Sequence, residues 1–274
     1  MPVELTSGML PPGEATDKIM CLVSSFPGKG KSGFALSFPE PIWYFNLDRA
    51  IGHFHDAWAT RKVTYEAVVI DVDKPSPAVA NAYLAKFDLL VRDAIKSKTN
   101  GTFIIDGWDI FWDLVKYAKL PAGGADSMPK EWAEANEYMN NHLRRLGLSQ
   151  LNAVFTTIAS KVWTGMKTET DRVRADGFKH KDRWLTHEVY LFSPENNTEP
   201  EAVPKNAATP GQAHYARINQ SKLNEKLIGV VVPSLTFSLL YKLTWGRPYS
   251  QPERLWSPAQ AARATLSQPE SPGE

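Results

Sequence analysis

The stretch Ser25-Phe-Pro-Gly-Lys-Gly-Lys-Ser32 decides how this chain folds. It fits the pattern G-x-x-x-x-G-K-[ST], in which a strand turns into a helix around a phosphate group, except that Ser25 takes the first glycine position. The short apolar run from Lys18 to Val23 precedes the stretch, and a helix can start near Gly33 before Pro39 stops it. We therefore expect a buried strand, a tight turn and a helix in that order.

The residue types in this turn suit the binding of a nucleotide. Gly28 and Gly30 allow the backbone to point successive N–H groups at one anion. Lys31 is expected to bridge the β- and γ-phosphates of ATP, and the Ser32 hydroxyl to bind Mg²⁺. The alternative is a Gly/Lys surface turn without a ligand. The expected nucleotide contacts are Ser25, Phe26, Pro27, Gly28, Lys29, Gly30, Lys31, Ser32 and Gly33.

A second motif is the strand Thr102–Asp106 (TFIID), which ends in a carboxylate. Ligands of open α/β sheets bind at the carboxyl ends of parallel strands. Asp106 is therefore expected to hold the Mg²⁺ ion together with its water shell. The alternative is an aspartate that only forms a turn, as many strand ends have.

Two more carboxylates are candidates for handling the attacking water. Asp48 follows the strand Ile42–Asn46, and a nucleotide-hydrolysing site needs a base or a water-orienting group near the γ-phosphate. The alternative is a solvated aspartate that caps a helix starting at Arg49. Asp109 is a weaker candidate, which we expect to face outward from its helix.

Apolar strands alternate with amphipathic segments along the chain, which predicts a mostly parallel sheet flanked by helices. Further strands are expected over 68–72 and 151–158, and helices over 76–98 and 108–119. Another helix carries Trp132, Met139, Leu143 and Leu146 on one face. Later strands or a short terminal helix are expected over 188–192, 215–218 and 235–241. We divide the chain into a polar lead-in (1–17), one α/β domain (18–247) and a flexible Pro/Ser/Gln-rich tail (248–274).

Composition excludes several classes of protein. The 274 residues are 43% hydrophobic and 22% charged, which excludes a wholly disordered chain. With 31 basic against 30 acidic side chains, any affinity for nucleic acid must come from a local patch. Cys21 is the single cysteine, and His180 and His187 lack the spacing of a zinc site. No apolar run reaches membrane-spanning length and no signal peptide is evident, so we expect a cytoplasmic protein with no membrane partner.

The segment from Ser160 to Leu185 combines cations with aromatic side chains. Cations follow a phosphate backbone and aromatic rings stack on unpaired bases, so this composition favours single-stranded DNA binding. The alternative is a solvated loop or a β-hairpin whose aromatic residues pack on the body. The expected DNA contacts are Lys161, Trp163, Lys167, Arg172, Arg174, Lys179, Lys181, Arg183 and Trp184.

Together these motifs resemble those of phage-encoded RecA-like P-loop ATPases, the small recombination proteins grouped as Sak-type single-strand annealing proteins. The resemblance runs from about Lys18 to Tyr241. It is carried by SFPGKGKS (25–32), YFNLD (44–48), TFIIDGW (102–108), EWAEANEYM with LNAVFTTIAS (131–160), and ARINQSK (216–222).

The resemblance implies a RecA-like core that uses ATP and Mg²⁺, with Lys31, Ser32 and Asp106 at the nucleotide. Asp48 stands where such proteins hold a water-activating carboxylate, normally glutamate, and its shorter side chain puts fast hydrolysis in doubt. Thr157 is implied as a polar group that senses the γ-phosphate, the alternative being an ordinary strand residue. Lys222 is implied to reach the nucleotide of a neighbouring subunit in a ring or filament, the alternative being an ordinary surface lysine.

The implied function is an ATP-hydrolysing recombination protein that binds single-stranded DNA. Its partners would be phage or host recombination proteins in the cytoplasm of an infected bacterial cell. Two alternatives remain open at this point. One is a nucleotide-gated interaction module with little hydrolysis, and the other is a nucleoside or nucleotide kinase.

Overall fold

A computed structural model of the chain describes residues 17–48, 62–68, 75–120, 129–164, 168–193 and 215–250. Within these residues the strands form one sheet in the order β3-β2-β4-β5-β1-β7-β8-β9, with β6 paired to β5. The pairs from β3 to β7 are parallel, whereas β8, β9 and β6 join antiparallel. The strands are β1 (Met20–Ser25), β2 (Ile42–Asn46), β3 (Val63–Ala67), β4 (Thr102–Asp106), β5 (Asn152–Thr164), β6 (Thr168–Ala175), β7 (His187–Phe192), β8 (Tyr215–Ser221) and β9 (Val231–Pro233).

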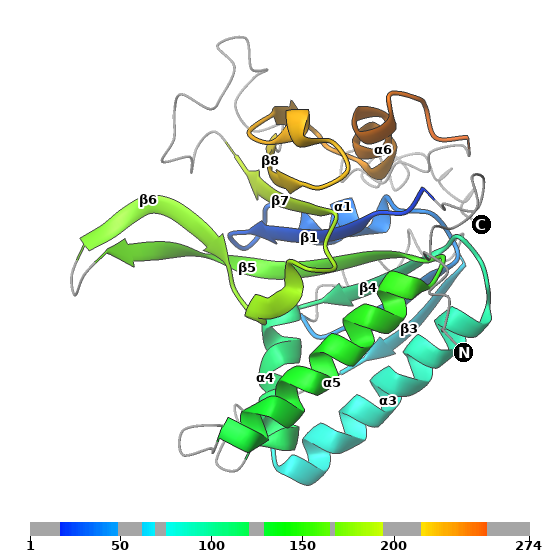
Figure 1. Cartoon of the computed structure of the whole chain (residues 1–274), viewed down its shortest axis with the longest axis vertical. Coiled ribbons are helices and arrows are strands. Elements are labelled where there is room, and N and C mark those ends of the chain that lie inside the picture. Colours follow the sequence, from blue (N-terminus) through cyan, green and yellow to red (C-terminus); the bar gives the residue numbers. More distant parts are fainter. Residues whose placement is uncertain are drawn as a thin grey trace, which may run out of the picture.

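Helices cover both faces of this sheet, which confirms the expected fold class of a mostly parallel sheet flanked by helices (Figure 1). The helices α3, α4 and α5 pack on one face, and α1 and α6 pack on the other. Their bounds are α1 (Lys31–Leu36), α3 (Pro77–Lys96), α4 (Trp108–Lys119), α5 (Pro129–Leu148) and α6 (Phe237–Trp245).

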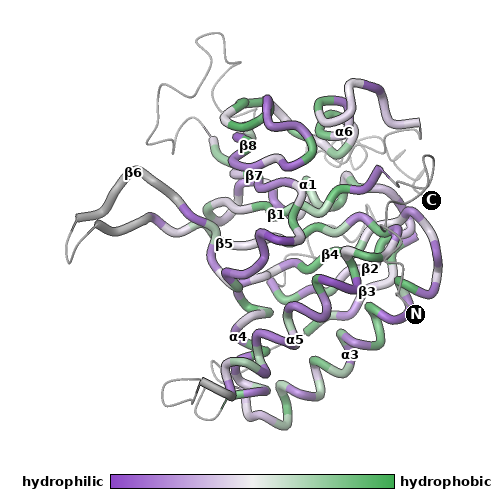
Figure 2. The backbone as a smooth tube through the Cα atoms, in the orientation of Figure 1, coloured by the Kyte–Doolittle hydropathy of each residue, from purple (hydrophilic) through white to green (hydrophobic). Residues whose placement is uncertain are grey.

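Two hydrophobic clusters follow from the alternation of side chains along the strands. Phe45, Phe103 and Phe155 face the α3–α5 layer, where the first two pack on Phe87 and Phe155 packs on Trp108. Tyr44 and Ile104 face α1 and α6 on the other side of the sheet. In Figure 2, α3 and α5 alternate between hydrophobic and hydrophilic residues along their length, as expected for helices with one face on a core.

The sequence places most of these elements within two or three residues of where the structure has them. The helix predicted over 76–98 is α3, which begins after Ser76, whose hydroxyl accepts from the Val79 amide at 3.4 Å. Of the strand predicted over 68–72 only Val68 is described, and the structure has the strand β3 directly before it, at Val63–Ala67. This edge strand is largely exposed and carries Thr64 and Glu66, so hydropathy does not reveal it. Residues 69–74 lie outside the described ones.

The fifth strand is longer than predicted, and this changes the view of the basic segment. β5 continues past Ile158 to Thr164, where it pairs with β6 to form a hairpin that projects from the body (Figure 1). A short 3-10 turn, η3 (Lys179–Lys181), follows β6. Ser160 to Leu185 is therefore a β-hairpin and a turn, which was one of the two forms that the alternative allowed. A hairpin that projects into solvent needs no apolar face. Its strands therefore lack the alternation of apolar and polar residues from which strands are predicted.

Lys18 fastens the start of β1 to the end of α5. Its ammonium group donates to the carbonyl oxygens of Leu146 and Ser149 at 3.2 and 2.7 Å, and also to that of Gly147. The last carbonyls of a helix lack the usual backbone donors of the next turn, and a cation at this end is also favoured by the negative pole of the helix. Burial lowers the pKa of Lys18 to about 8.

The ends of the expected domain make contacts with its body. The Asp17 carboxylate accepts from the hydroxyl of Tyr241 at 2.6 Å and from Arg247. Tyr249, placed in the tail by sequence, packs edge-on against Phe237 of α6. The remainder of the predicted lead-in (1–16) and of the tail (251–274) lies outside the described residues. No helix in the described part of the chain has the length and apolar character needed to cross a bilayer.

His187 is a buried histidine at the start of β7. Its two ring nitrogens lie 3.0 Å from the Thr186 hydroxyl and 3.1 Å from the Thr244 hydroxyl. A neutral imidazole satisfies such partners with one donor and one acceptor nitrogen. Burial lowers the pKa of His187 to about 4, so the folded protein keeps this ring uncharged at neutral pH.

We predict that folding stability falls as the pH drops through the range from about 6.5 to about 4, because there the unfolded chain protonates His187 and the folded chain does not. Between pH 7.5 and pH 5 the loss from this group should be about 2 kcal/mol. Urea unfolding at both pH values measures the loss. His187→Gln should reduce it, whereas His180→Gln, at an exposed position, should not. An equal loss in wild type and His187→Gln would contradict the assignment.

Candidate nucleotide site

The turn between β1 and α1 has the backbone that the motif requires. Gly28 and Gly30 have φ values of 75° and 87°, a left-handed conformation that other residues rarely adopt. A Cβ atom at Gly28 would meet nothing within 4 Å, so backbone conformation rather than crowding requires glycine there. The side chain of Lys29 leaves the turn and donates to the Ser193 hydroxyl at 2.9 Å. Phe26, Pro27 and Gly33 are partly or fully exposed around it.

Lys31 is buried at the start of α1, with 8% of its surface exposed. Its ammonium group lies 3.2 Å from the hydroxyl oxygen of Ser25 and 3.5 Å from the Ser25 carbonyl. Burial lowers the pKa of Lys31, and the nearby charges of Asp48, Asp106 and Asp109 partly offset this. The serine that departs from the motif therefore supplies a direct partner for its lysine.

Asp106 lies at the carboxyl end of β4 and is fully buried. Its carboxylate accepts from the Ser32 hydroxyl at 3.0 Å and from the hydroxyl groups of Tyr44 and Thr156. Desolvating a carboxylate is costly unless hydrogen bonds replace its water, and these three donors do so. The structure thus brings together Ser32 and Asp106, the pair that the sequence predicts as metal ligands.

Tyr44 and Thr156 were missed by the sequence analysis. They lie on β2 and β5, the two strands that flank β4, and Thr156 is the register partner of Asp106. Burial, followed by the charge of Asp106, raises the pKa of Tyr44 well above its ordinary value, so this phenol stays a donor. These two residues are recognised as neighbours of Asp106 only once the order of the strands in the sheet is known. The sequence motifs do not specify that order.

Asn46 is a third residue that the sequence analysis missed. It pairs with Asp106 across β2 and β4 and is 4% exposed. Its side-chain oxygen is buried and has no hydrogen-bond partner among the described residues. Mg²⁺ and its bound waters interact with oxygen ligands, so the Ser32 hydroxyl, the Asp106 carboxylate and this free oxygen fit a magnesium site.

Asp48 and Asp109 are close enough to the Lys31 ammonium group for their charges to affect its pKa. Asp48 lies just beyond β2 with part of its side chain exposed. Partial desolvation and the charges of Asp106 and Asp109 raise the pKa of its carboxyl, while the charge of Lys31 lowers it. The prediction that Asp109 faces outward was wrong, because its carboxylate accepts from the Thr157 hydroxyl at 3.2 Å. Gly107, in the left-handed conformation, starts α4 directly after β4 and so places Asp109 in the first turn, at the end of the sheet.

Thr157 points to the opposite face of the sheet from Thr156, because successive side chains alternate. Its hydroxyl contacts Asp109 and the Asp176 carbonyl rather than the Asp106 group. Its role as a sensor of the γ-phosphate remains a prediction. The Lys222 ammonium donates to the Asp182 carbonyl of the same chain, so its action on a neighbouring subunit also remains a prediction.

The candidate DNA contacts are spread over the hairpin and the turn that follows it. Lys161 lies on β5, Arg174 on β6 is exposed, and Lys179 and Arg183 are exposed around η3. Lys181 is buried, close to Glu188, which makes it a poor contact for DNA. The side chains of Trp163, Lys167 and Arg172 lie outside the described ones.

Trp184 packs on the body rather than standing free. A Cβ atom on Gly147 of α5 would lie 2.7 Å from its ring, so only glycine permits this approach. The other aromatic residue of the segment with a described side chain, Phe178, is buried against Trp112. For these two rings the packing alternative is the one that the structure supports.

No known family model matches this chain, and no curated protein matches it in sequence. Two solved structures show a distant structural likeness to this chain. One is a KaiC-like protein from the hyperthermophilic archaeon Pyrococcus horikoshii OT3, at 13% identity and a TM-score of 0.43, over 78% of this chain and 84% of that one. Another is an ATPase from the type III secretion system of pathogenic bacteria, at 12% identity and a TM-score of 0.46, over 68% of this chain and 54% of that one. At these identities the likeness concerns the fold alone.

We predict that Lys31→Ala weakens Mg·ATP binding by about 10- to 100-fold, because one charge-assisted phosphate contact is lost. Isothermal titration of the purified variant measures this. Lys29→Ala is the matched control, since its side chain bonds to Ser193 and its backbone N–H survives the change. If both proteins are folded and bind ATP with equal affinity, the assignment of the turn from Ser25 to Ser32 as the phosphate-binding site is contradicted.

Proposed function

We propose that this chain binds and hydrolyses Mg·ATP, and that hydrolysis serves binding of single-stranded DNA in strand annealing or recombination. The observation that carries the ATPase part is the convergence of Lys31, Ser32 and Asp106 at the carboxyl ends of β1 and β4. A buried lysine beside a buried carboxylate–hydroxyl pair is the arrangement that phosphate and magnesium need.

Each residue of the site has a distinct task in this proposal. The turn from Ser25 to Ser32 binds the phosphates through backbone N–H groups, and Lys31 neutralises their charge. Magnesium, when bound by Ser32 and Asp106, withdraws charge from the phosphate oxygens. The hydroxyl groups of Tyr44 and Thr156 hold the Asp106 carboxylate in place.

Asp48 is the proposed base that orients the attacking water and accepts its proton. Its raised pKa makes it more basic than an ordinary aspartate, which favours proton transfer. Hydrolysis should therefore decline as the pH falls through a value above the usual aspartate range. Because the Asp48 side chain is shorter than that of glutamate, we expect turnover to be slow.

The connection to DNA is supported by the path of β5. This strand passes Asp106 at Thr156 and continues without interruption into the projecting hairpin with Lys161. One strand thus joins the proposed nucleotide site to the proposed DNA surface, so movement at either end can reach the other. We further propose a ring or filament of such chains, in which Lys222 approaches the nucleotide of a neighbour.

We predict that single-stranded DNA stimulates ATP turnover by the wild-type protein.

A second prediction concerns the base. Asp48→Asn should lower turnover by about 100-fold or more while leaving ATP binding in place, because only proton transfer is lost. Phosphate release with and without DNA measures both effects. Asp113→Asn, on the exposed side of α4, is the control.

Three results would contradict parts of the proposal. Turnover that DNA does not change would remove the recombination role, and transfer of phosphate to a small acceptor would indicate a kinase. Tight ATP binding with no turnover in any condition would indicate a nucleotide-gated module.

A further inference from the structure

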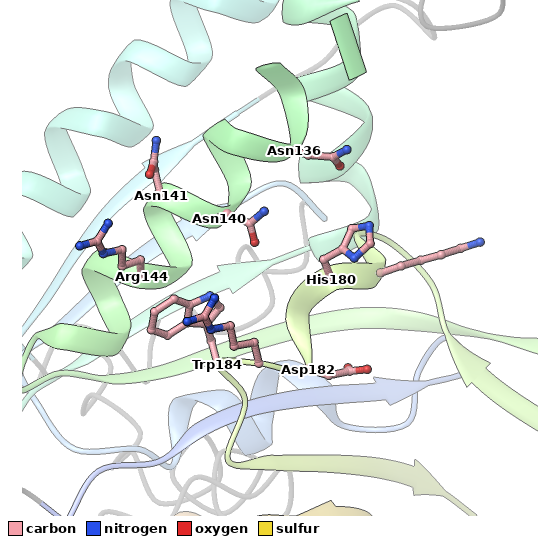
Figure 3. Close-up of a pocket in the computed structure, with 9 residues that line it drawn as sticks. Asn136, Asn140, Asn141, Arg144, His180, Asp182 and Trp184 are labelled. Carbon is pink, nitrogen blue, oxygen red and sulfur yellow. The ribbon is translucent and has the colours of Figure 1, made fainter. Parts of the chain in front are cut away.

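A cavity of about 700 Å³ lies between α5 and the segment that follows β6. Figure 3 shows α5 supplying one wall and the segment around η3 supplying the other. The volume is in the range of small-ligand sites. Its lining residues are Asn136, Asn140, Asn141, Arg144, Lys179, His180, Asp182, Arg183 and Trp184. Four of these lie on α5, a helix that contributes to none of the sites described above.

The α5 wall presents a stripe of polar side chains. Asn136, Asn140 and Arg144 are spaced by four residues and therefore share one face of the helix. Asparagine amides both donate and accept, as the edges of nucleobases require. Arginine binds phosphate oxygens with two parallel hydrogen bonds.

The opposite wall carries most of the charge. Lys179 and Arg183 are exposed, and Asp182 is the one acidic residue among the lining side chains. The Arg183 guanidinium lies over the Trp184 ring, 5.4 Å from its centre. Trp184 is itself fixed against Gly147, so it holds the guanidinium in place by a cation–π contact. With Arg144 from α5, three cations line one cavity.

We propose that this cavity binds one or two nucleotide units of a single DNA strand, with cations on the phosphates and asparagine amides on the bases. The inference rests on the proposed function and extends it by assigning α5 as part of the DNA surface. The segment from Lys179 to Trp184 follows the hairpin directly, so a strand that lies along the hairpin leads into the cavity. The mixture of amides, cations and a tryptophan suits nucleotides better than a purely acidic ligand.

Arg144 and Arg145 provide a matched pair for the test. Both are exposed on α5, but Arg144 lines the cavity whereas Arg145 is close to Asp88 on α3. Binding of a labelled oligodeoxythymidylate of about 20 nucleotides is measured by fluorescence anisotropy over a range of salt concentrations. Arg144→Ala should weaken binding about fivefold at 0.1 M salt and reduce the slope against log salt by about 0.7. Arg145→Ala should change neither.

Further measurements separate the outcomes. DNA binding by Arg174→Ala tests the contribution of the hairpin surface already proposed. ATP turnover without DNA should be the same in Arg144→Ala and Arg145→Ala. If wild type binds the oligonucleotide and Arg174→Ala weakens it while Arg144→Ala does not, the cavity assignment alone is overturned. If wild type does not bind the oligonucleotide at all, the DNA part of the proposed function fails with it.

Competitors distinguish the chemistry of the ligand. Neither free thymidine monophosphate nor polyglutamate should displace the oligonucleotide at matched charge concentration. Displacement by the monophosphate in wild type but not in Arg144→Ala would assign the cavity to a free nucleotide and overturn the proposal. Equal displacement by polyglutamate would assign it to any polyanion and overturn it too.

Discussion

The buried carboxylate of Asp106 is the constraint on which the rest of the site depends. A fully buried charge must be compensated, and Ser32, Tyr44 and Thr156 supply three hydroxyl donors from α1, β2 and β5. These donors come from elements far apart in the sequence, so the carboxylate fixes how the turn, the sheet and the first helix meet. The same contacts keep an oxygen-rich site beside Lys31, where phosphate and magnesium bind in our proposal.

The register of the sheet then distributes polar groups between its two faces. Thr156 faces Asp106 and α1, whereas Thr157 faces Asp109 and the start of α4. β5 lies between β1 and β4, so the phosphate turn and Asp106 are separated by one strand. That strand extends into the hairpin, which gives the proposed coupling between nucleotide and DNA a continuous path. The cavity beside α5 lies next to the segment in which this path ends.

The sequence predicts the parts of this account that depend on local pattern. The turn around Gly28 and Gly30, the strand that ends in Asp106 and the layers of helices all follow from periodicity and motif. Tyr44, Asn46 and Thr156 depend on which strands are neighbours, and no local pattern encodes that order. The polar strands β3 and β6 escape prediction because an edge or a projecting hairpin needs no apolar face. The sequence predicts Trp184 as a DNA contact, because nothing in its neighbourhood along the chain indicates that its ring packs against Gly147.

The central claim is that Asp106 and Ser32 form the metal-binding part of an ATP site. The most direct test is ATP affinity measured across a range of Mg²⁺ concentrations for wild type, Asp106→Asn and, as control, Asp109→Asn. Thermal unfolding verifies that each variant is folded. The account predicts that affinity rises with Mg²⁺ in wild type and in Asp109→Asn, and that this dependence is lost in Asp106→Asn. An Asp106→Asn protein that keeps the wild-type dependence on Mg²⁺ would contradict it.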